Sequence, residues 1–226
     1  IMAKGLAHCA SHGITGLHNM DGNVYQLELL AALEADGDLK CRTEVPMHLK
    51  HTDSLDRLSE AADMRAAYHS DMVWSSRVKM FMDGVIDSRT AFMLKPYPNT
   101  DSRSAPLFSD AHFKEACTRA DKMGLQIAVH AIGDAAVRQT LDGYEAAQKA
   151  NGVRDSRHRI EHIETIHPDD IPRIAALGAV ASIQPLHSPR GGFFPPYEKG
   201  FLLHDAQYEN AFAWKKIRDS GAKMIF

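Results

Sequence analysis

The sequence has no long apolar run, and its few cysteines are not paired. No stretch approaches the roughly 20 apolar residues that a membrane-spanning helix needs, so we expect no membrane partner. Cys9, Cys41 and Cys117 are odd in number and widely spaced, without a CxxC pair. This argues against a disulfide framework and against a zinc ribbon, and a reducing cytoplasm is the expected compartment.

The chain also lacks an excess of charge of either sign. Its formal net charge is -3 over 226 residues, and it has no run of basic residues. Neither nucleic acid nor an anionic membrane surface is therefore an expected partner. The hydrophobic fraction of 44% and the charged fraction of 24% are ordinary for a globular chain that buries a substantial core. We expect a single domain.

Both ends lack the features of a complete chain. The sequence opens on Ile1 without a signal-peptide pattern, and it closes on Ile225-Phe226 inside an expected strand. We therefore expect a fragment. On this interpretation, the missing signal sequence says nothing about the compartment of the parent protein.

Apolar strand patterns alternate with helical patterns, and no GxGxxG turn occurs. The alternation predicts an α/β fold with a parallel sheet and right-handed crossovers. About seven strands without a dinucleotide-binding turn favour a (β/α)8 TIM barrel, incomplete, with about strands 2 to 8 present in one partial domain over residues 1–226. The expected strands are 13–20, 41–49, 77–84, 126–130, 158–164, 179–187 and 222–226, and the expected helices are 2–11, 24–35, 53–69, 110–123, 134–150, 168–177 and 208–220.

Two long segments, 84–108 and 188–207, show no sustained periodicity. Loops of this length in a compact domain are usually functional lids or mobile segments, so we expect them to carry substrate specificity. In the second loop, Phe193, Phe194 and Tyr197 either line an apolar substrate pocket or only pack the loop.

Lys79, His130 and His162 lie at or near the carboxyl ends of three expected strands. In parallel α/β folds, this edge holds the chemistry. Two neutral imidazoles from adjacent strands suit a divalent metal ion, zinc above all. A buried lysine can lose its proton and react with carbon dioxide, and the resulting carbamate could bridge two metals. Taken singly, each residue is more often structural, so the pattern alone leaves both interpretations open.

Five motifs together resemble the amidohydrolase superfamily. They are Gly13-Ile14-Thr15 with His18, the strand 78–84 followed by Ser88-Arg89-Thr90, and the segments 130–136, 157–162 and 182–187. In order, they are most similar to the YtcJ-like branch, amidohydrolase family 3, which includes N-substituted formamide deformylase.

The resemblance implies a distorted TIM barrel in which metal-bound hydroxide attacks an amide or other C–N bond of a small molecule. Lys79 would be carboxylated and bridge two metals, and His130 and His162 would bind the second metal. The family's His-x-His pair would lie before Ile1, and the aspartate that serves as ligand and general base would lie beyond Phe226, so no general base is assigned within this chain. Zinc is the first choice for one or two ions, while iron, manganese, nickel and cobalt also suit these donors.

Other polar residues near the expected strand ends have two interpretations each. His187 orients substrate or is structural, and Asp83 and Arg89 contact substrate or only shape the loop. Asp134 is the expected N-cap of the following helix. The remaining histidines, His158 among them, are expected mostly at the surface.

Two alternatives to the amidohydrolase stay open. One is a catalytically silent barrel fragment, and the other is a phosphoesterase or lactonase on the same metal platform, because loops set the substrate while ligands set the nucleophile. The sequence is compatible with a homodimer without deciding the oligomeric state.

Overall fold

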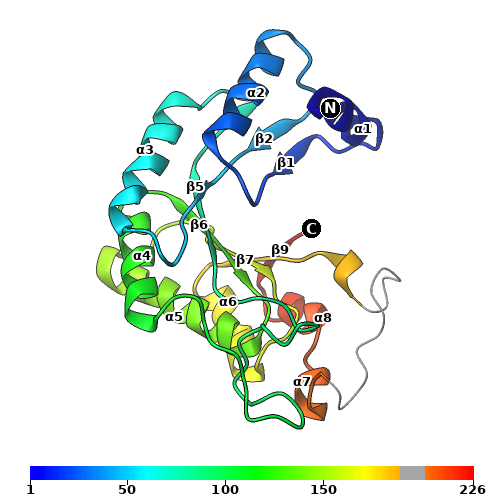
Figure 1. Cartoon of the computed structure of the whole chain (residues 1–226), viewed down its shortest axis with the longest axis vertical. Coiled ribbons are helices and arrows are strands. Elements are labelled where there is room, and N and C mark those ends of the chain that lie inside the picture. The colour runs from blue at the N-terminus through cyan, green and yellow to red at the C-terminus, as the bar shows by residue number, and fades with distance from the viewer. Residues whose placement is uncertain (189–201) are drawn as a thin grey trace. The chain divides into compact units, whose positions relative to one another are not determined.

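The computed structural model describes residues 1–188 and 202–226, and the chain divides into two compact units. Unit 1 is Ile1–Lys79 and unit 2 is Met80–Phe226, and Figure 1 shows the helices and strands of both. The two units do not decide whether residues 1–226 form one partial barrel domain, which stays a prediction.

Unit 1 combines short parallel strands with three helices. Strands β1, β2 and β4 form one parallel sheet in that order, and β3 pairs in parallel with the start of β5. Its elements are α1 (Met2–Ser11), β1 (Gly16–His18), α2 (Val24–Ala35), β2 (Arg42–Glu44), β3 (Met47–His48), η1 (Leu55–Arg57), α3 (Leu58–Ala67), β4 (Val73–Trp74) and β5 (Arg77–Phe81), which continues into unit 2.

Local chemistry explains the boundaries in unit 1. Asn23 and Gln26 form a capping box that starts α2 where the helical pattern predicts it. The expected strand 41–49 is wrong as one element, because β2 and β3 are separated at Val45-Pro46. Proline has no backbone N–H to donate to a sheet, and Pro46 lies at this break.

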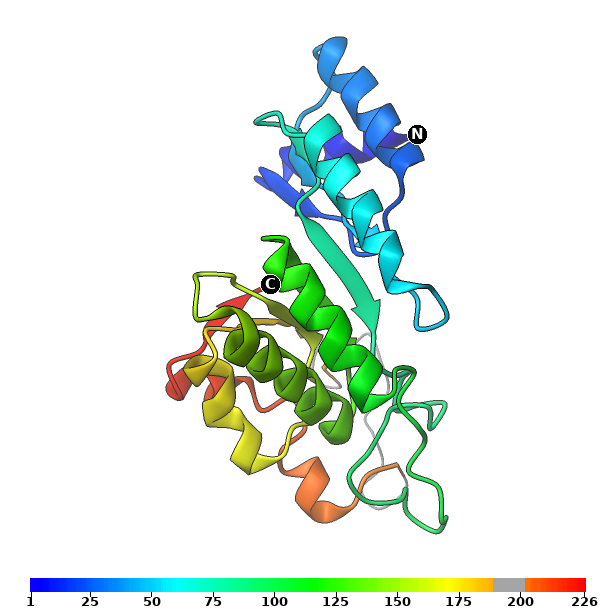
Figure 2. The same cartoon turned by 90° about the vertical axis from the view of Figure 1, so that its left-hand side faces the viewer.

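Unit 2 carries a longer parallel sheet in the order β6-β7-β8-β9. Helices α4 and α5 lie side by side along it (Figure 2). Its elements are α4 (Asp110–Lys122), β6 (Gln126–Ala131), α5 (Asp134–Asn151), β7 (Arg159–His162), η2 (Pro168–Asp170), α6 (Ile171–Ala176), β8 (Val180–Ser182), η3 (Pro185–His187), α7 (Asp205–Tyr208), α8 (Trp214–Asp219) and β9 (Lys223–Ile225).

The starts of α4 and α5 differ in how they are capped. Ser109 is the N-cap of α4, and its side chain accepts a hydrogen bond from the backbone N–H of His112. The expectation for Asp134 is wrong, because Gly133 is the N-cap of α5 and Asp134 is its first helical residue. The Asp134 carboxylate instead accepts the backbone N–H of Leu94 at 2.8 Å, so it holds the preceding loop.

The expected helix 208–220 is also wrong as one element. It is replaced by α7, which ends at Tyr208, and by α8, which begins at Trp214. Between them, Phe212 has a left-handed φ of 49° and donates its N–H to the carbonyl of Glu164 at 2.8 Å. A non-glycine residue in this region ends a helix, and its backbone bond goes to the segment after β7 instead.

The first long loop, 84–108, contains no helix or strand, as expected. It is nevertheless packed, because Ile86, Met93 and Tyr97 are buried in a hydrophobic cluster with Ile132 and Leu203. Most of the second loop, including Phe193, Phe194 and Tyr197, lies outside the described residues, so its expected role stays a prediction.

These elements confirm an α/β fold built on parallel sheets. Within unit 2 the described strands form an open sheet, and so do the three strands β1, β2 and β4 of unit 1. A closed barrel is therefore not formed by the described strands of either unit. Among the described residues, no helix has both the length and the apolar character to cross a membrane.

Candidate metal centre

Two histidines meet at the carboxyl ends of neighbouring strands in unit 2. His130 is the penultimate residue of β6, and His162 is the last residue of β7. Their ring centroids are 4.6 Å apart, with the rings nearly perpendicular at 69°. The structure thus brings together the two imidazoles that the sequence singles out.

Strand register alone would not bring these rings together. In the parallel pairing of β6 with β7, His130 lies opposite Glu161, and His162 lies one position further along. Successive side chains of a strand point to opposite faces, so a regular β7 would direct His162 away from His130. Instead, His162 and Ile163 have left-handed φ values of 79° and 49°. This conformation is rare for a β-branched residue, and it ends the alternation where the His162 ring turns towards His130.

Each of the two rings has one nitrogen bonded to an oxygen acceptor. Nε2 of His130 lies 2.9 Å from the carbonyl of Gly84, and Nδ1 of His162 lies 2.7 Å from Oε1 of Gln184. Because these oxygens only accept, the ring nitrogens that face them carry the protons. In the neutral rings, the lone pair is then on Nδ1 of His130 and on Nε2 of His162.

This bonding pattern fits a metal centre. Metal-binding histidines almost always donate their other N–H to a carbonyl or carboxylate, which fixes the tautomer and the ring orientation. Among residues 1–188 and 202–226, however, no three His, Cys, Asp or Glu side chains gather as a metal-binding group. Lys79, the third ligand expected from the sequence, is not one of these four residue types.

Lys79 lies in the part of β5 that belongs to unit 1. It is 1% exposed, and its carbonyl accepts the backbone N–H of Leu49 at 3.0 Å. In the parallel pairing of β3 with β5, Lys79 lies opposite His48. Burial in a strand is the setting that the sequence predicts for this lysine, and its role as a ligand stays a prediction.

Further polar side chains lie around His162, and His187 is the one among them for which the sequence suggests a role. Gln184 follows β8 and accepts from His162, as described above. The His187 ring is stacked on the His162 ring, with centroids 5.5 Å apart and an interplanar angle of 9°. Nδ1 of His187 lies 3.3 Å from Oε1 of Glu164, which is buried. Gln184 belongs to a motif singled out in the sequence, but no pattern in one sequence indicates a contact over 22 residues.

The Asp83 carboxylate is buried beside His130 and accepts three hydrogen bonds from backbone N–H groups. Its carboxylate accepts the N–H groups of Phe92, Ile132 and Gly133 at 2.8 to 3.0 Å. Burial raises the pKa of Asp83 to about 7, against these three bonds, and the charge of Glu164 adds to the rise. These contacts favour the loop-shaping interpretation, while contact with substrate stays a prediction.

Arg89 is the third residue proposed from the sequence to meet substrate. It lies in a turn of the loop 84–108, where its N–H donates to the carbonyl of Ile86 at 2.8 Å and its φ is 55°. Its part in substrate binding also stays a prediction.

Unit 2 contains two further groups of buried polar side chains. Arg159 and Glu161 alternate on one face of β7 and form an ion pair at 2.9 Å, and Arg159 also donates to Ser182. The other is His158, which is 3% exposed, so its expected surface position is wrong. Its Nδ1 accepts the N–H of Ile127, and its Nε2 therefore donates to the Asp121 carboxylate at 3.2 Å.

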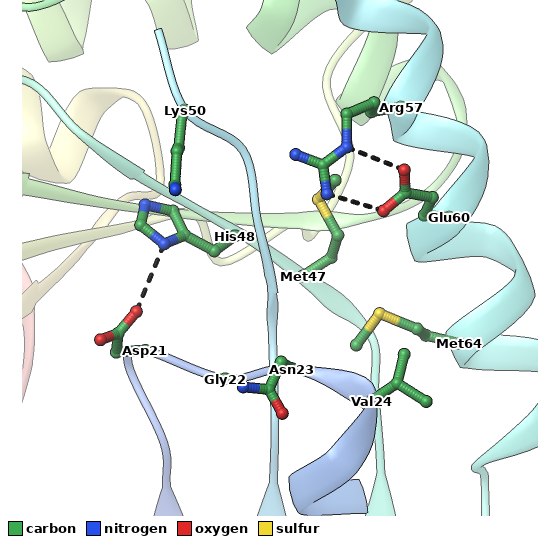
Figure 3. A pocket seen from close by; sticks show the side chains of 10 residues that line it. All are labelled: Asp21, Gly22, Asn23, Val24, Met47, His48, Lys50, Arg57, Glu60 and Met64. Atoms are coloured by element: carbon green, nitrogen blue, oxygen red, sulfur yellow. Dashed lines mark hydrogen bonds and ion pairs between the residues drawn. The ribbon is translucent and has the colours of Figure 1, made fainter. Parts of the chain in front are cut away.

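Unit 1 contains a separate pocket of about 320 Å³. Figure 3 shows two acid–base pairs at its wall, His48 with Asp21 at 3.3 Å and Arg57 with Glu60 at 2.8 Å. Burial lowers the pKa of His48, and the nearby Asp21 carboxylate opposes this shift. The pocket is lined by Asp21, Gly22, Asn23, Val24, Met47, His48, Lys50, Arg57, Glu60 and Met64. Because acids and bases largely pair with each other, its walls do not define the charge of a ligand.

Comparisons with known proteins address the family and the fold of this chain. The family model described as "Amidohydrolase family" matches residues 1–226. The chain is 26% identical to the putative amidohydrolase YtcJ of Bacillus subtilis over 97% of its own length and 40% of that protein. It is 36% identical to the protein LONG AFTER FAR-RED 3 of Arabidopsis thaliana over 58% of its own length and 23% of that protein.

Two further likenesses concern an enzyme and a fold. The chain is 26% identical to the N-substituted formamide deformylase of Arthrobacter pascens, over 58% of its own length and 22% of that enzyme. A crystal structure of an uncharacterized metal-dependent hydrolase from Pyrococcus horikoshii OT3 superposes with a TM-score of 0.79 at 22% identity, covering 99% of this chain and 43% of that one.

The chain therefore spans less than half the length of each of these relatives. The family match nevertheless extends over all 226 residues and includes every motif on which the resemblance depends. The chain belongs to the amidohydrolase family.

Proposed function

We propose that this chain is part of a metal-dependent hydrolase that cleaves an amide or another C–N bond of a small molecule, with His130 and His162 as ligands of a divalent metal ion. The observation that carries the proposal is the pair of imidazoles at the ends of β6 and β7, each with one nitrogen bonded to an oxygen acceptor. Membership of the amidohydrolase family and the likeness to a structure described as a metal-dependent hydrolase support the same chemistry.

A bound divalent ion would polarise a substrate carbonyl and lower the pKa of water, which is the chemistry that hydrolysis needs. The protein residues supply the positions. The Gly84 carbonyl holds the His130 ring, and the Gln184 amide oxygen holds the His162 ring. Both nitrogens left with lone pairs belong to imidazoles, for which zinc is the first choice.

The other assignments in this proposal rest on the sequence. Lys79 is the third ligand, in carboxylated form, as the family resemblance implies, and its burial in β5 is in keeping with that role. Asp83, Arg89 and His187 are proposed to contact substrate. His187 is the best placed of these three, because its ring is stacked on that of His162.

The metal-to-protein ratio, measured by plasma emission spectroscopy, tests the metal site. We expect the purified protein to bind zinc and a His130→Ala, His162→Ala double variant to lose it. A His8→Ala, His69→Ala double variant is the matched control, because it removes two histidines from unit 1 that are not part of the proposed site. Equal metal content in all three proteins would contradict the proposal.

A substrate panel then separates the hydrolase classes. We expect turnover of amides that requires zinc and is absent from the His130→Ala, His162→Ala variant. Zinc-dependent turnover of phosphate esters or lactones alone would favour the alternative chemistry on the same metal platform. Zinc binding without any turnover would favour a catalytically silent barrel.

A further inference from the structure

Gln184 lies against the ring of His162 with its amide held in one orientation. Its Nε2 donates to the carbonyl of Ser182 at 3.4 Å, and its Oε1 lies 2.7 Å from Nδ1 of His162. Because the amide NH2 group faces a carbonyl, which only accepts, the amide oxygen is the atom that faces the imidazole.

This orientation decides which nitrogen of His162 carries the proton. An amide oxygen cannot donate, so the hydrogen bond at 2.7 Å requires the proton on Nδ1 of His162. The tautomer of a neutral histidine is set by the hydrogen bond that one of its nitrogens makes. With the proton on Nδ1, the lone pair that a metal needs is on Nε2.

The packing around His162 restricts the ring but leaves the tautomer undecided. The His187 ring is stacked on His162, and the His130 ring meets it nearly edge to face. The left-handed backbone at His162 and Ile163 fixes where the side chain leaves the strand. These ring contacts fix the plane of the His162 imidazole, whereas the hydrogen bond to Gln184 fixes which of its nitrogens carries the proton.

From these contacts, the geometry points to Gln184 as a positioning residue that keeps Nδ1 of His162 protonated and Nε2 as the metal-binding nitrogen. Removing a residue that hydrogen-bonds the other nitrogen of a metal-binding histidine typically lowers metal affinity by about 10- to 100-fold. The effect on affinity rests on the metal site of the proposed function. The effect on the tautomer does not, because it is measurable in the metal-free protein.

The first measurement is therefore the tautomer of His162, by long-range proton–nitrogen NMR on metal-free protein labelled with 15N-histidine. A His162→Asn variant assigns the signal among the 13 histidines. We expect the Nδ1–H form in the wild type, and a shift towards the Nε2–H form in Gln184→Leu, which has no acceptor. Gln184→Glu retains an acceptor oxygen, so it is expected to keep the Nδ1–H form even if Gln184→Leu fails to fold.

The second measurement is zinc affinity by calorimetric titration of the same proteins. We expect an affinity about 10- to 100-fold lower in Gln184→Leu, and an affinity at least as high as the wild type in Gln184→Glu. Gln148→Leu is the matched control, because Gln148 lies in α5 and donates to Leu177 instead. It should change neither the tautomer of His162 nor the affinity.

The outcomes of the two measurements distinguish a failure of the role proposed for Gln184 from a failure of the proposed metal-dependent function. An Nδ1–H tautomer that persists in Gln184→Leu, or a wild type and Gln184→Glu that show the Nε2–H form, would overturn the positioning role of Gln184. A wild-type protein that shows the expected tautomers but binds no zinc would overturn the proposed metal-dependent function and still support Gln184 as the residue that sets the tautomer.

Discussion

At the scale of single residues, burial and a neighbouring carboxylate shift the pKa of His158 in opposite directions. Burial lowers its pKa, and the hydrogen bond and charge of Asp121 only partly oppose this. Although burial alone would raise the pKa of Asp121, hydrogen bonds from His158, Asn151 and Arg154 lower it well below its usual range. The native state therefore holds a neutral histidine beside an ionised aspartate at neutral pH.

This arrangement predicts a pH dependence of stability. Between its lowered folded pKa and the ordinary value of 6.5, His158 binds more protons in the unfolded state than in the folded state. The free energy of unfolding therefore falls as the pH is lowered through this window. We expect His158→Gln, which retains an acceptor for the Ile127 N–H, to show a smaller fall, measured by urea denaturation at a series of pH values.

His69→Gln is the control for this prediction, because His69 is exposed in unit 1. It should leave the slope of stability against pH as in the wild type. A His158→Gln variant with the wild-type slope would show that His158 is not the group that titrates.

Single residues also mark the limit of what the sequence could predict about the site. His130 could be found because it ends an apolar run, and His162 could be found because it lies near the end of the next expected strand. The left-handed backbone at Ile163 could not be predicted, because the residues that indicate a positive φ in a sequence are Gly, Asn and Asp. Nor could Gln184, whose role depends on how β7 and β8 pair in space.

At the scale of elements, the loop 84–108 is tied to the sheet of unit 2 through Asp83. This carboxylate accepts one N–H from the loop, at Phe92, and two from the segment after β6, at Ile132 and Gly133. Asp83→Asn replaces one accepting oxygen with a donor. We expect a loss of about 1 to 3 kcal/mol in the free energy of unfolding, because a buried N–H is left without its acceptor.

Hydrogen exchange locates this effect. Phe92 and Gly133 both donate to Oδ2 of Asp83, and Ile132 donates to Oδ1, so an asparagine that keeps two of the three bonds loses the bond to Ile132. The amide of Ile132 should therefore exchange faster in Asp83→Asn, while amides of α4, which lies outside the loop, should be less affected. Asp87→Asn is the matched control, since Asp87 lies exposed in the same loop. Unchanged protection of the Ile132 amide would contradict the anchoring role of Asp83.

The same loop approaches the start of α5 too closely for a side chain at Gly133. A Cβ there would lie 2.0 Å from the carbonyl oxygen of Phe92, an atom of the backbone that has little freedom to move. We expect Gly133→Ala to lower the free energy of unfolding by about 1 to 3 kcal/mol, as overpacking typically does, in chemical denaturation.

Gly5→Ala is the opposite case. Gly5 lies inside α1, and no atom lies within 4 Å of the position that a Cβ would take. The substitution should raise stability by about 0.5 to 1 kcal/mol, because glycine is a poor helix former. If both variants changed stability equally, the close approach of the loop would not be the cause.

The helical and strand patterns predicted most elements in position, and the failures have local causes. α1 and α2 have the expected bounds, and the expected strands of unit 2 are all present, with β6 one residue longer than expected and β7, β8 and β9 shorter. β4, with only Val73 and Trp74, was missed because two residues carry no period. The break between α7 and α8 was missed because a tertiary bond to Phe212 overrides a helical pattern.

At the scale of the whole molecule, alternation of strands and helices predicts parallel sheets but not their closure. Each parallel pairing is local, while closure depends on strands at the two edges of a sheet, and these lie far apart in the sequence. The family is shown by motifs spread over the entire chain, so it does not depend on closure. The sequence thus predicts the fold class and the family, but it does not predict whether the sheet closes into a complete barrel.

Binding of a metal ion should be visible in the stability of the protein as a whole. A ligand that binds only the folded state, at 100 times its dissociation constant, stabilises that state by about 2.7 kcal/mol. For a chain of this size, this corresponds to a rise in Tm of about 5 to 10 °C. We expect this rise when zinc is added to the metal-free protein, measured by calorimetry, and no rise in the His130→Ala, His162→Ala variant. Magnesium, which prefers oxygen ligands, is the control ion, and an equal rise with magnesium in both proteins would place the binding elsewhere than at the two imidazoles.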